Sequence, residues 1–319
     1  MLLKALPMTP CPDKVPVSVL IPAKNEERNL PACLASLARA NEIFVVDSQS
    51  SDRTAAIAAA AGAQVIQFQF SGDWPKKKNW ALDHLPFSHE WVLIVDCDER
   101  IPPALWDEIA TAIHQGSYDG YYLNRRVWFL GTWIRHGGKY PDWNLRLFRH
   151  RQGRYENLHT ADIPNTGDNE VHEHVIIEGA VGYLRHDIIH EDLRDLYHWL
   201  ARHNRYSNWE ARVYYNLLTG RDRGDTIAPN LFGNPVQRKR FLKTIWVRLP
   251  CRPLLRFWLV YGVQLGFLDG RAGYIYARLL SQYESQIGIK LLELRRFGGQ
   301  LNPGPAPAEP SYPPAKTSI

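Results

Sequence analysis

Residues 17–27 read VSVLIPAKNEE, a continuous apolar run that turns polar directly after Pro22. Such a run is typical of a strand buried on both faces of a sheet. The pattern repeats along the chain, so we expect a helix over about 27–40, a strand over 43–46, a helix over 54–61, a strand over 64–68, a helix over 77–84 and a strand over 91–95. Alternating strands and helices predict an α/β fold with a mostly parallel sheet flanked by helices.

The second half of the sequence is less regular. We expect a helix over 103–114, short strands over 121–123, 145–148 and 175–177, and a long amphipathic helix over 192–218. The residues from Pro303 onward are rich in proline, which predicts disorder. These patterns divide the chain into a domain over 15–190, a helical extension over 191–298 and a tail over 299–319.

Composition excludes several classes of protein. The 319 residues are 45% hydrophobic and 22% charged, as in ordinary globular proteins and unlike disordered chains or membrane bundles. The net charge of +5 comes without any nucleic-acid-binding motif. The four cysteines are widely spaced, which fits a reducing compartment. No signal peptide is found, and the late apolar run 257–268 is shorter than the about 20 residues of a spanning helix, so we expect a cytoplasmic location.

Three polar stretches follow predicted strands: AKNEE at 23–27, DSQSSD at 47–52 and DCDE at 96–99. Ligands of open parallel sheets bind at the carboxyl ends of the strands, where these stretches lie. No glycine-rich phosphate loop is present, so a metal must hold any phosphate. Asp96 and Asp98 can both offer oxygens to a divalent cation that bridges a diphosphate; the alternative is a solvated acidic turn.

Other charged residues near these strand ends have two interpretations each. Asp47 directly follows a strand and is a ligand candidate, whereas Asp52 fits a helix cap. One lysine of the run 76–78 can neutralise phosphate charge at the start of a helix, but the run can equally form a solvated face.

The motifs quoted so far, together with Lys78-Asn79, resemble family 2 glycosyltransferases with the GT-A fold, a Rossmann-like α/β domain. Further along, HGGKYPDW at 136–143, LRLFR at 145–149 and VHE at 171–173 resemble the branch that contains bacterial lipopolysaccharide-core β-1,4-glucosyltransferases. The resemblance covers about residues 15–295.

The resemblance implies inverting transfer of a sugar from a nucleotide-sugar donor to a saccharide or lipid-linked acceptor in envelope or polysaccharide biosynthesis. It implies Mg²⁺ or Mn²⁺ at Asp98 with Asp96 toward the ribose, and His190 matches a histidine that often completes the metal site. A purely structural histidine is the alternative there. The positions that match the donor site are Pro22, Ala23, Asn25, Glu27, Asp47, Lys78 and Asp96.

One position departs from the family pattern. Many relatives carry a second acid directly after the position of Asp47, where it reads the nucleobase, and this chain has Ser48. Uridine diphosphate is still the favoured carrier, with Asp47 as the substitute for that contact.

The catalytic base is expected in the second half. Glu173 matches the His-Glu pair of the resembling branch, Glu170 is a nearby competitor, and an ion pair with an arginine is the structural alternative. Trp143 offers a flat face to a sugar ring, beside Asp142. Arg146 can pair either with acids or with an anionic acceptor, and all three are acceptor-site candidates.

Basic residues gather late in the chain, with no acid between Asp225 and Asp269. Large apolar residues such as Trp246 and Trp258 are interleaved with them, which predicts a helix lying on an anionic membrane surface; a solvated basic face is the alternative. The cations are Arg238, Lys239, Arg240, Lys243, Arg248, Arg252 and Arg256.

Two rival functions use other features of the sequence. A zinc hydrolase would use histidines, but no H-E-x-x-H motif is present and the Asp96/Asp98 pair would have no role. A non-catalytic saccharide-binding protein would keep the fold without turnover. The histidines in question are His159, His172, His174, His186 and His190.

Overall fold

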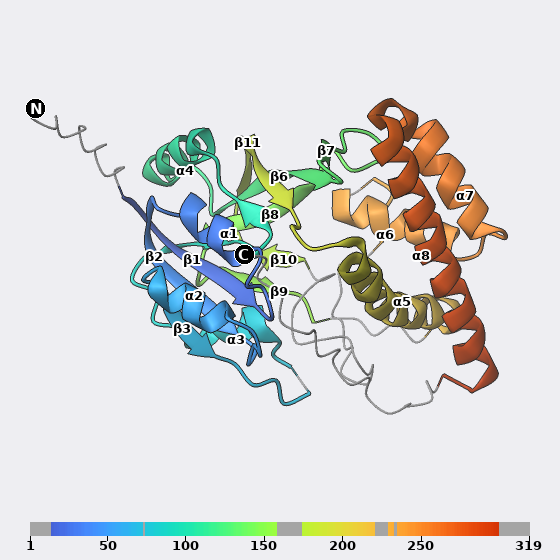
Figure 1. Cartoon of the computed structure of the whole chain (residues 1–319), viewed down its shortest axis with the longest axis horizontal. Helices are drawn as coiled ribbons and strands as arrows, with labels where there is room; N and C mark the ends of the chain where they lie inside the picture. The colour runs from blue at the N-terminus through green and yellow to red at the C-terminus, as the bar shows by residue number, and fades with distance from the viewer. Residues whose placement is uncertain (1–13, 73, 158–173, 221–228, 233–234, 300–319) are drawn as a thin grey trace, which may run out of the picture.

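The computed structural model describes residues 14–72, 74–157, 174–220, 229–232 and 235–299 (Figure 1). A nine-stranded sheet in the order β3-β2-β1-β4-β8-β6-β11-β5, with β7 paired to β6, forms its centre. The first four strands, β1 (Val15–Ala23), β2 (Ala40–Asp47), β3 (Gln64–Gln67) and β4 (Trp91–Ile94), are all parallel, as predicted.

The second half of the chain adds antiparallel pairs to this sheet. β8 (Trp143–Arg149) runs antiparallel to both β4 and β6 (Gly120–Phe129), while β11 (Val181–Glu191) is parallel to β6. β5 (Glu99–Arg100) pairs with β11, and β7 (Thr132–Trp133) pairs with β6. A separate two-stranded sheet joins β9 (Gly153–Tyr155) to β10 (Val175–Ile177). The α/β fold class is confirmed, with a parallel first half and a mixed second half.

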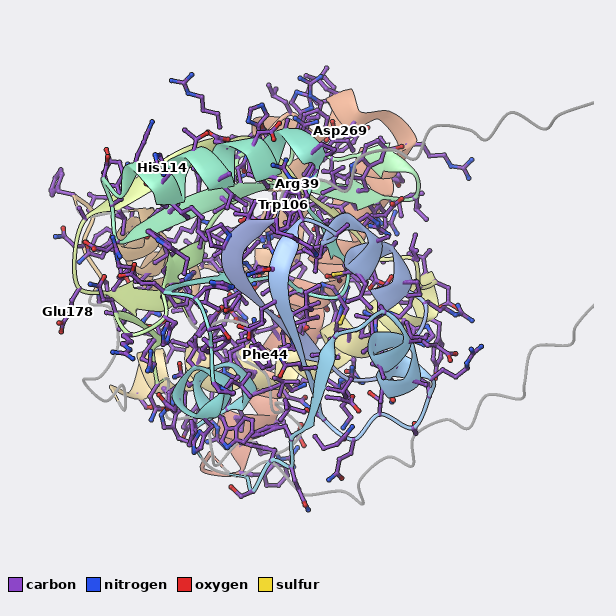
Figure 2. The ribbon with its side chains drawn as sticks, turned by 90° about the vertical axis from the view of Figure 1, so that its left-hand side faces the viewer. Arg39, Phe44, Trp106, His114, Glu178 and Asp269 are labelled. Carbon is purple, nitrogen blue, oxygen red and sulfur yellow. The ribbon has the colours of Figure 1, made fainter. Side chains whose placement is uncertain are left out.

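Both faces of the sheet are covered, which explains why β1 is apolar except for Ser18, whose hydroxyl donates to Glu42. Val17, Val19 and Ile21 pack on the side of α1 (Leu30–Ser36), α2 (Thr54–Ala60) and α4 (Pro103–Gln115). Leu20 points to the opposite face, where α3 (Lys77–His84) and the small sheet lie. Figure 2 labels one large residue of each core, Trp106 of α4 on one face of the sheet and Phe44 of β2 on the other.

Local sequence signals set where several helices begin and end. α4 begins with a proline in its first turn and ends at Gly116, which adopts the left-handed conformation (φ +60°) that favours glycine. Asp195 caps α5 (Leu196–Thr219) by accepting a hydrogen bond from His198 N, so this helix begins later than the predicted residue 192. The first helix is shorter than the predicted range 27–40 because β2 already begins at Ala40.

The C-terminal helices form the extension that the sequence predicted. They are α5, α6 (Pro235–Trp246), α7 (Arg252–Trp258), a π-helical turn (Leu259–Val263), a 3₁₀ turn (Gly266–Asp269) and α8 (Gly270–Arg296). α5 and α8 share a core that includes Tyr214 and Ile287, and Val260 packs with Phe129 of β6. In the described residues no helix combines the length and hydropathy that a bilayer span requires. The predicted tail lies outside the described residues.

Candidate functional site

The three polar stretches after β1, β2 and β4 meet at one edge of the sheet, as predicted. Ala23 pairs with Asp47 in the register of β1 and β2, and Ser48 N donates a hydrogen bond to Ala23 O at 3.0 Å. Asn25 N donates to Ser50 Oγ at 2.8 Å. Cys97, between the two aspartates, lies with its Sγ 3.5 Å from Pro22 O. The carboxyl ends of these strands therefore build a single polar surface.

Asp47 anchors the loop that follows β2. Its carboxylate accepts hydrogen bonds from the backbone and side chain of Ser50 and, at 2.9 Å, from Gln67 Nε2. Asn25 adopts a positive φ of 54° and accepts from Ser51 N at 2.8 Å. These contacts hold the loops after β1 and β2 together, so Asn25 and Asp47 shape this end of the site.

Glu27 and Asp52 complete the link between the same two loops. Glu27 N donates to Asp52 Oδ2 at 3.1 Å, and Glu27 Oε2 accepts from Arg53 N at 3.3 Å. Asp52 Oδ1 also accepts from Thr54 N at 2.9 Å at the start of α2, which fits the capping interpretation of Asp52.

The three lysines at the start of α3 are buried, so they do not form a solvated face. Lys77 Nζ donates to Ala23 O at 2.8 Å and thereby ties α3 to the end of β1. Lys78 Nζ lies 3.4 Å from Asp96 Oδ1. The helix therefore brings one lysine to the aspartate pair, as the phosphate-neutralising interpretation requires.

Asp96 belongs to a buried network of charges. Arg146 Nη2 donates to Asp96 Oδ2 at 2.6 Å and to Glu99 Oε1 at 3.1 Å. Burial alone would raise the pKa of Asp96, but Arg146 and Lys78 outweigh it and hold this pKa well below its usual range. Of the two roles left open for Arg146, the structure shows the pairing with acids.

Asp98 faces a histidine and an arginine. His190 Nε2 on β11 lies 3.4 Å from Asp98 Oδ2, and Arg202 Nη1 on α5 lies 3.6 Å from the same oxygen. Burial would raise the pKa of Asp98, yet His190 and Arg202 lower it to about 2. Burial lowers the pKa of His190, but the neighbouring Asp98 carboxylate outweighs this and raises it. Asp98 and His190, which the resemblance assigns to a metal site, thus lie against each other in the structure.

The donor atoms here fit a divalent cation that shares its coordination with a substrate. Among the described residues, no group of three or more His, Cys, Asp or Glu side chains forms a metal cage. Asp98 and His190 lie together, and both Asp96 Oδ1 and His190 Nδ1 are buried without a hydrogen-bond partner. Mg²⁺ is usually bound by one or two carboxylates plus substrate phosphates, which matches this small ligand set.

The histidines do not assemble a zinc site in the described part of the chain. His186 Nδ1 contacts Glu108 of α4 at 2.8 Å, whereas His190 contacts Asp98. His174 N donates to Glu156 Oε1 at 3.0 Å beside the small sheet. His159 and His172 lie outside the described residues. Each described histidine therefore has a separate environment, unlike the clustered ligands of a catalytic zinc.

Trp143 lies in an aromatic cluster on the β6-β8-β11 part of the sheet. Its ring meets Tyr183 edge-on at 5.1 Å between centroids, and Tyr183 stacks on Tyr122 at 5.0 Å. Asp142 accepts from Arg125 Nη2 at 2.6 Å. Burial would raise the pKa of Asp142, but Arg125 and Lys139 outweigh it and hold this pKa well below its usual range. Asp142 therefore stays ionised beside the aromatic cluster.

The two candidate bases, Glu170 and Glu173, lie outside the described residues. The chain resumes at His174, and Val175 packs in the same core as Leu145 and Tyr122. This core lies on the face of the sheet that carries α3 and its lysines.

Residues of α5 and its N-terminal approach were missed by the sequence analysis. Arg194 Nη1 donates to Glu26 Oε1 at 2.9 Å, and Arg202 contacts Asp192 at 3.0 Å in addition to Asp98. Burial raises the pKa of Glu26 to about 7 although Arg194 opposes this. No sequence motif joins Glu26 to residues more than 160 positions away, so only the folded chain reveals this network.

Comparisons with known proteins show which family the chain belongs to. The family model described as glycosyl transferase family 2 matches residues 18–167. The lipopolysaccharide core biosynthesis glycosyltransferase LpsC of Rhizobium meliloti (strain 1021) is 30% identical over 213 residues, which cover 62% of this chain and 71% of that protein. The chain belongs to glycosyl transferase family 2. It is therefore an enzyme that transfers a sugar, and the matched range contains both aspartates of the site.

Two solved structures are more distant. Glucosyl-3-phosphoglycerate synthase from Mycobacterium tuberculosis, solved with Mn²⁺, UDP and its product, is 25% identical over 34% of this chain and 44% of that chain, with a TM-score of 0.29. S. aureus TarS 1–349 is 16% identical over 88% of this chain and 91% of that chain, with a TM-score of 0.41. Because both scores are low, the fold of this transferase rests on its own sheet topology.

Proposed function

We propose that this family 2 glycosyltransferase moves a sugar, with inversion, from a nucleotide-sugar donor to a saccharide or lipid-linked acceptor of envelope polysaccharide biosynthesis. The observation that carries the proposal is the meeting of Asp98, His190, Arg202 and Lys78 at the carboxyl edge of the sheet. A cation-rich edge that keeps Asp96 and Asp98 ionised suits a metal-bound diphosphate. The relationship to LpsC and the motifs at 136–149 and 171–173 support an acceptor of the lipopolysaccharide-core type.

The residues of this edge divide the work of holding the donor. Mg²⁺ or Mn²⁺ at Asp98 and His190 would supply Lewis-acid stabilisation of the departing diphosphate. Lys78 and Arg202 add positive charge from two different helices. Asp96, kept ionised by Arg146, can accept hydrogen bonds from ribose hydroxyls. Pro22, Ala23, Asn25, Glu27 and Asp47 form the loops that would enclose the nucleoside, and we propose UDP as its carrier.

The acceptor side supplies the proton transfer. We propose that Glu173 takes the proton of the acceptor hydroxyl while the oxygen of that hydroxyl bonds to the anomeric carbon of the donor sugar. The bond between the anomeric carbon and the diphosphate oxygen breaks at the same time. Attack on the face opposite the leaving group inverts the anomeric centre. Trp143 and Asp142 would hold the acceptor ring, since an aromatic face beside a carboxylate suits a sugar.

Asp98→Ala tests the site directly. We expect Mn²⁺-dependent UDP binding and sugar transfer to be lost while the chain still folds, because Asp98 lies in a loop between β4 and β5. The melting temperature should fall, since His190 and Arg202 lose their carboxylate partner. Asp107→Ala is the matched control, since Asp107 is an exposed helical residue paired only at the surface with Arg39. Titration calorimetry with UDP, GDP and dTDP, in the presence and absence of Mn²⁺, measures both the metal dependence of binding and the preferred nucleobase. Unchanged Mn²⁺-dependent binding in Asp98→Ala would contradict the metal site, and tighter GDP or dTDP binding would contradict the choice of UDP.

We further propose a peripheral location at the cytoplasmic face of the inner membrane, with residues 191–298 as the membrane-facing unit beside a transferase domain over 15–190. The support is the acid-free basic stretch before Asp269 and the apolar side chains exposed on the C-terminal helices.

A further inference from the structure

The basic stretch does not face outward as a whole. Arg240 contacts the buried Glu156 at 2.5 Å, Lys243 contacts Glu210 at 2.7 Å and Arg252 contacts Glu284 at 3.0 Å. These three cations bind α6 and α7 to the rest of the molecule, so they are not available to a lipid surface. Exposed positions must carry any membrane contact.

The exposed apolar side chains gather instead where α7 turns into α8. Val263 is 74% exposed and Trp258 is 58% exposed. Ring contacts make the patch continuous: Phe257 stacks on Tyr261 at 5.3 Å, and Tyr261 meets Phe267 at 6.2 Å. We call this surface the apolar turn; its exposed members are Leu254, Leu255, Trp258, Val263, Leu265, Phe267 and Leu268.

The apolar turn is held in one shape by close backbone contacts. A Cβ on Gly266 would lie 2.6 Å from Val260 O, and a Cβ on Gly273 would lie 2.0 Å from Gly266 O. Only glycine fits at these two positions, so the π-helical and 3₁₀ turns pack directly on the start of α8. The apolar side chains are thus presented by a fixed support.

Charge around the apolar turn is positive. Residues 226–268 contain no acid, and the next one, Asp269, is buried and hydrogen-bonded to His136, at 2.7 Å to its Nδ1. Arg248, Arg271 and Arg278 are exposed on the neighbouring segments. A fixed apolar surface with a basic rim is complementary to an anionic lipid leaflet, which offers acyl chains behind negative headgroups.

We propose that the apolar turn inserts into an anionic bilayer leaflet and places the acceptor segment at the lipid surface. Gly137 N donates to Gln264 O at 2.8 Å, so the 136–143 segment sits directly on the apolar turn. α7 lies on the side of α8 that is away from β2 and β3 (Figure 1). Asp269, labelled in Figure 2, joins the start of α8 to His136 after β7. Lipid binding follows from this surface alone, whereas delivery of a lipid-linked acceptor rests on the proposed function.

Vesicle flotation of the full chain tests the proposal with a charge-matched pair of variants. Val263→Asp/Leu268→Asp places two acids in the apolar turn. Ile289→Asp/Leu292→Asp makes the same change at two exposed positions of α8 that lie about 30 Å along the helix from its first residue, Gly270. Vesicles of phosphatidylcholine with phosphatidylglycerol are compared with pure phosphatidylcholine at low and high salt.

We expect the wild-type protein to float with anionic vesicles at low salt and poorly with neutral ones. Partition of Val263→Asp/Leu268→Asp should fall about tenfold or more, while the α8 control keeps most of its binding. Equal loss in both variants, or no flotation of the wild type, would overturn the proposal. Concentration-dependent dimers abolished by the same turn variant would show that a second copy covers this surface instead. Release of UDP from a donor, measured in parallel, reports the proposed function separately.

Discussion

Arg252→Met tests whether this cation holds the helices together or faces lipid. Arg252 is nearly buried: its Nε lies 3.0 Å from Glu284 Oε1, its Nη1 donates to Val247 O at 2.9 Å, and its guanidinium lies over the Tyr214 ring. Methionine keeps much of the apolar stem and removes the charge. Glu284, itself 4% exposed, is then left without its ion-pair partner.

The expected cost follows from leaving a buried carboxylate uncompensated. Removing one partner of a buried ion pair typically lowers the free energy of unfolding by about 3–5 kcal/mol. Burial already raises the pKa of Glu284, against the opposing effects of Trp246 and Arg252. Without Arg252 this pKa rises further, so the folded state holds a proton that the unfolded state releases at neutral pH. The variant should therefore lose most stability at pH 7–8 and less near pH 5, because the penalty shrinks as the pH falls from the raised folded pKa toward the unfolded value of about 4.3.

Urea unfolding followed by circular dichroism at pH 5 and pH 7.5 measures this difference. Arg248→Met is the matched control, because Arg248 is exposed and its side chain donates to Thr244 O in the last turn of α6. A change within about 1 kcal/mol is expected. Arg252→Met/Glu284→Met should recover much of the stability, since the unpaired carboxylate is gone. A loss below about 1 kcal/mol in Arg252→Met, or an equal loss at both pH values, would refute the assignment of a structural ion pair.

Two further predictions concern the proposed donor site and base. Arg202→Met should weaken UDP binding in the presence of Mn²⁺ by about 10- to 100-fold, as expected for a lost contact with a charged group. Arg205→Met, at an exposed position one turn further along α5, should change UDP binding little. Equal affinities of the two variants by calorimetry would contradict a contact between Arg202 and phosphate. Glu173→Gln should lower the transfer rate by about 10²- to 10⁴-fold with UDP affinity retained, and a normal rate there with a loss in Glu170→Gln would identify Glu170 as the base.

The first half of the fold could be predicted because its signals are local. The apolar run 17–21, buried on both faces, and the polar residues directly after β1, β2 and β4 locate the strands and the edge where they end. The parallel register of β1 with β2 and β4 then brings Ala23, Asp47 and Asp96 together without any further information. The α/β class and the clustering of these residues follow from this arrangement alone.

The charge partners could not be predicted because they depend on packing between distant segments. Whether Arg146 points to acids or to an acceptor is decided by the antiparallel insertion of β8 beside β4, which places its guanidinium against Asp96 and Glu99. The seven late cations looked alike in sequence, yet buried Glu156 and Glu284 select Arg240 and Arg252 as internal partners. A charge count therefore overestimated the basic surface, and the exposed apolar residues carry the membrane argument instead.

The contacts of α5 change how the C-terminal helices relate to the donor site. Arg194 binds Glu26 in the loop after β1, Asn29 Nδ2 donates to Asp192 at 3.0 Å, and Arg202 lies against Asp98. The same helix packs on α8, whose first turn supports the apolar turn. A substitution in the C-terminal helices can thus alter donor binding through α5 without touching the sheet. The C-terminal helices contribute side chains to the site that the strand ends build. The division into a transferase domain and an appendage therefore describes the order of the chain better than the organisation of its chemistry.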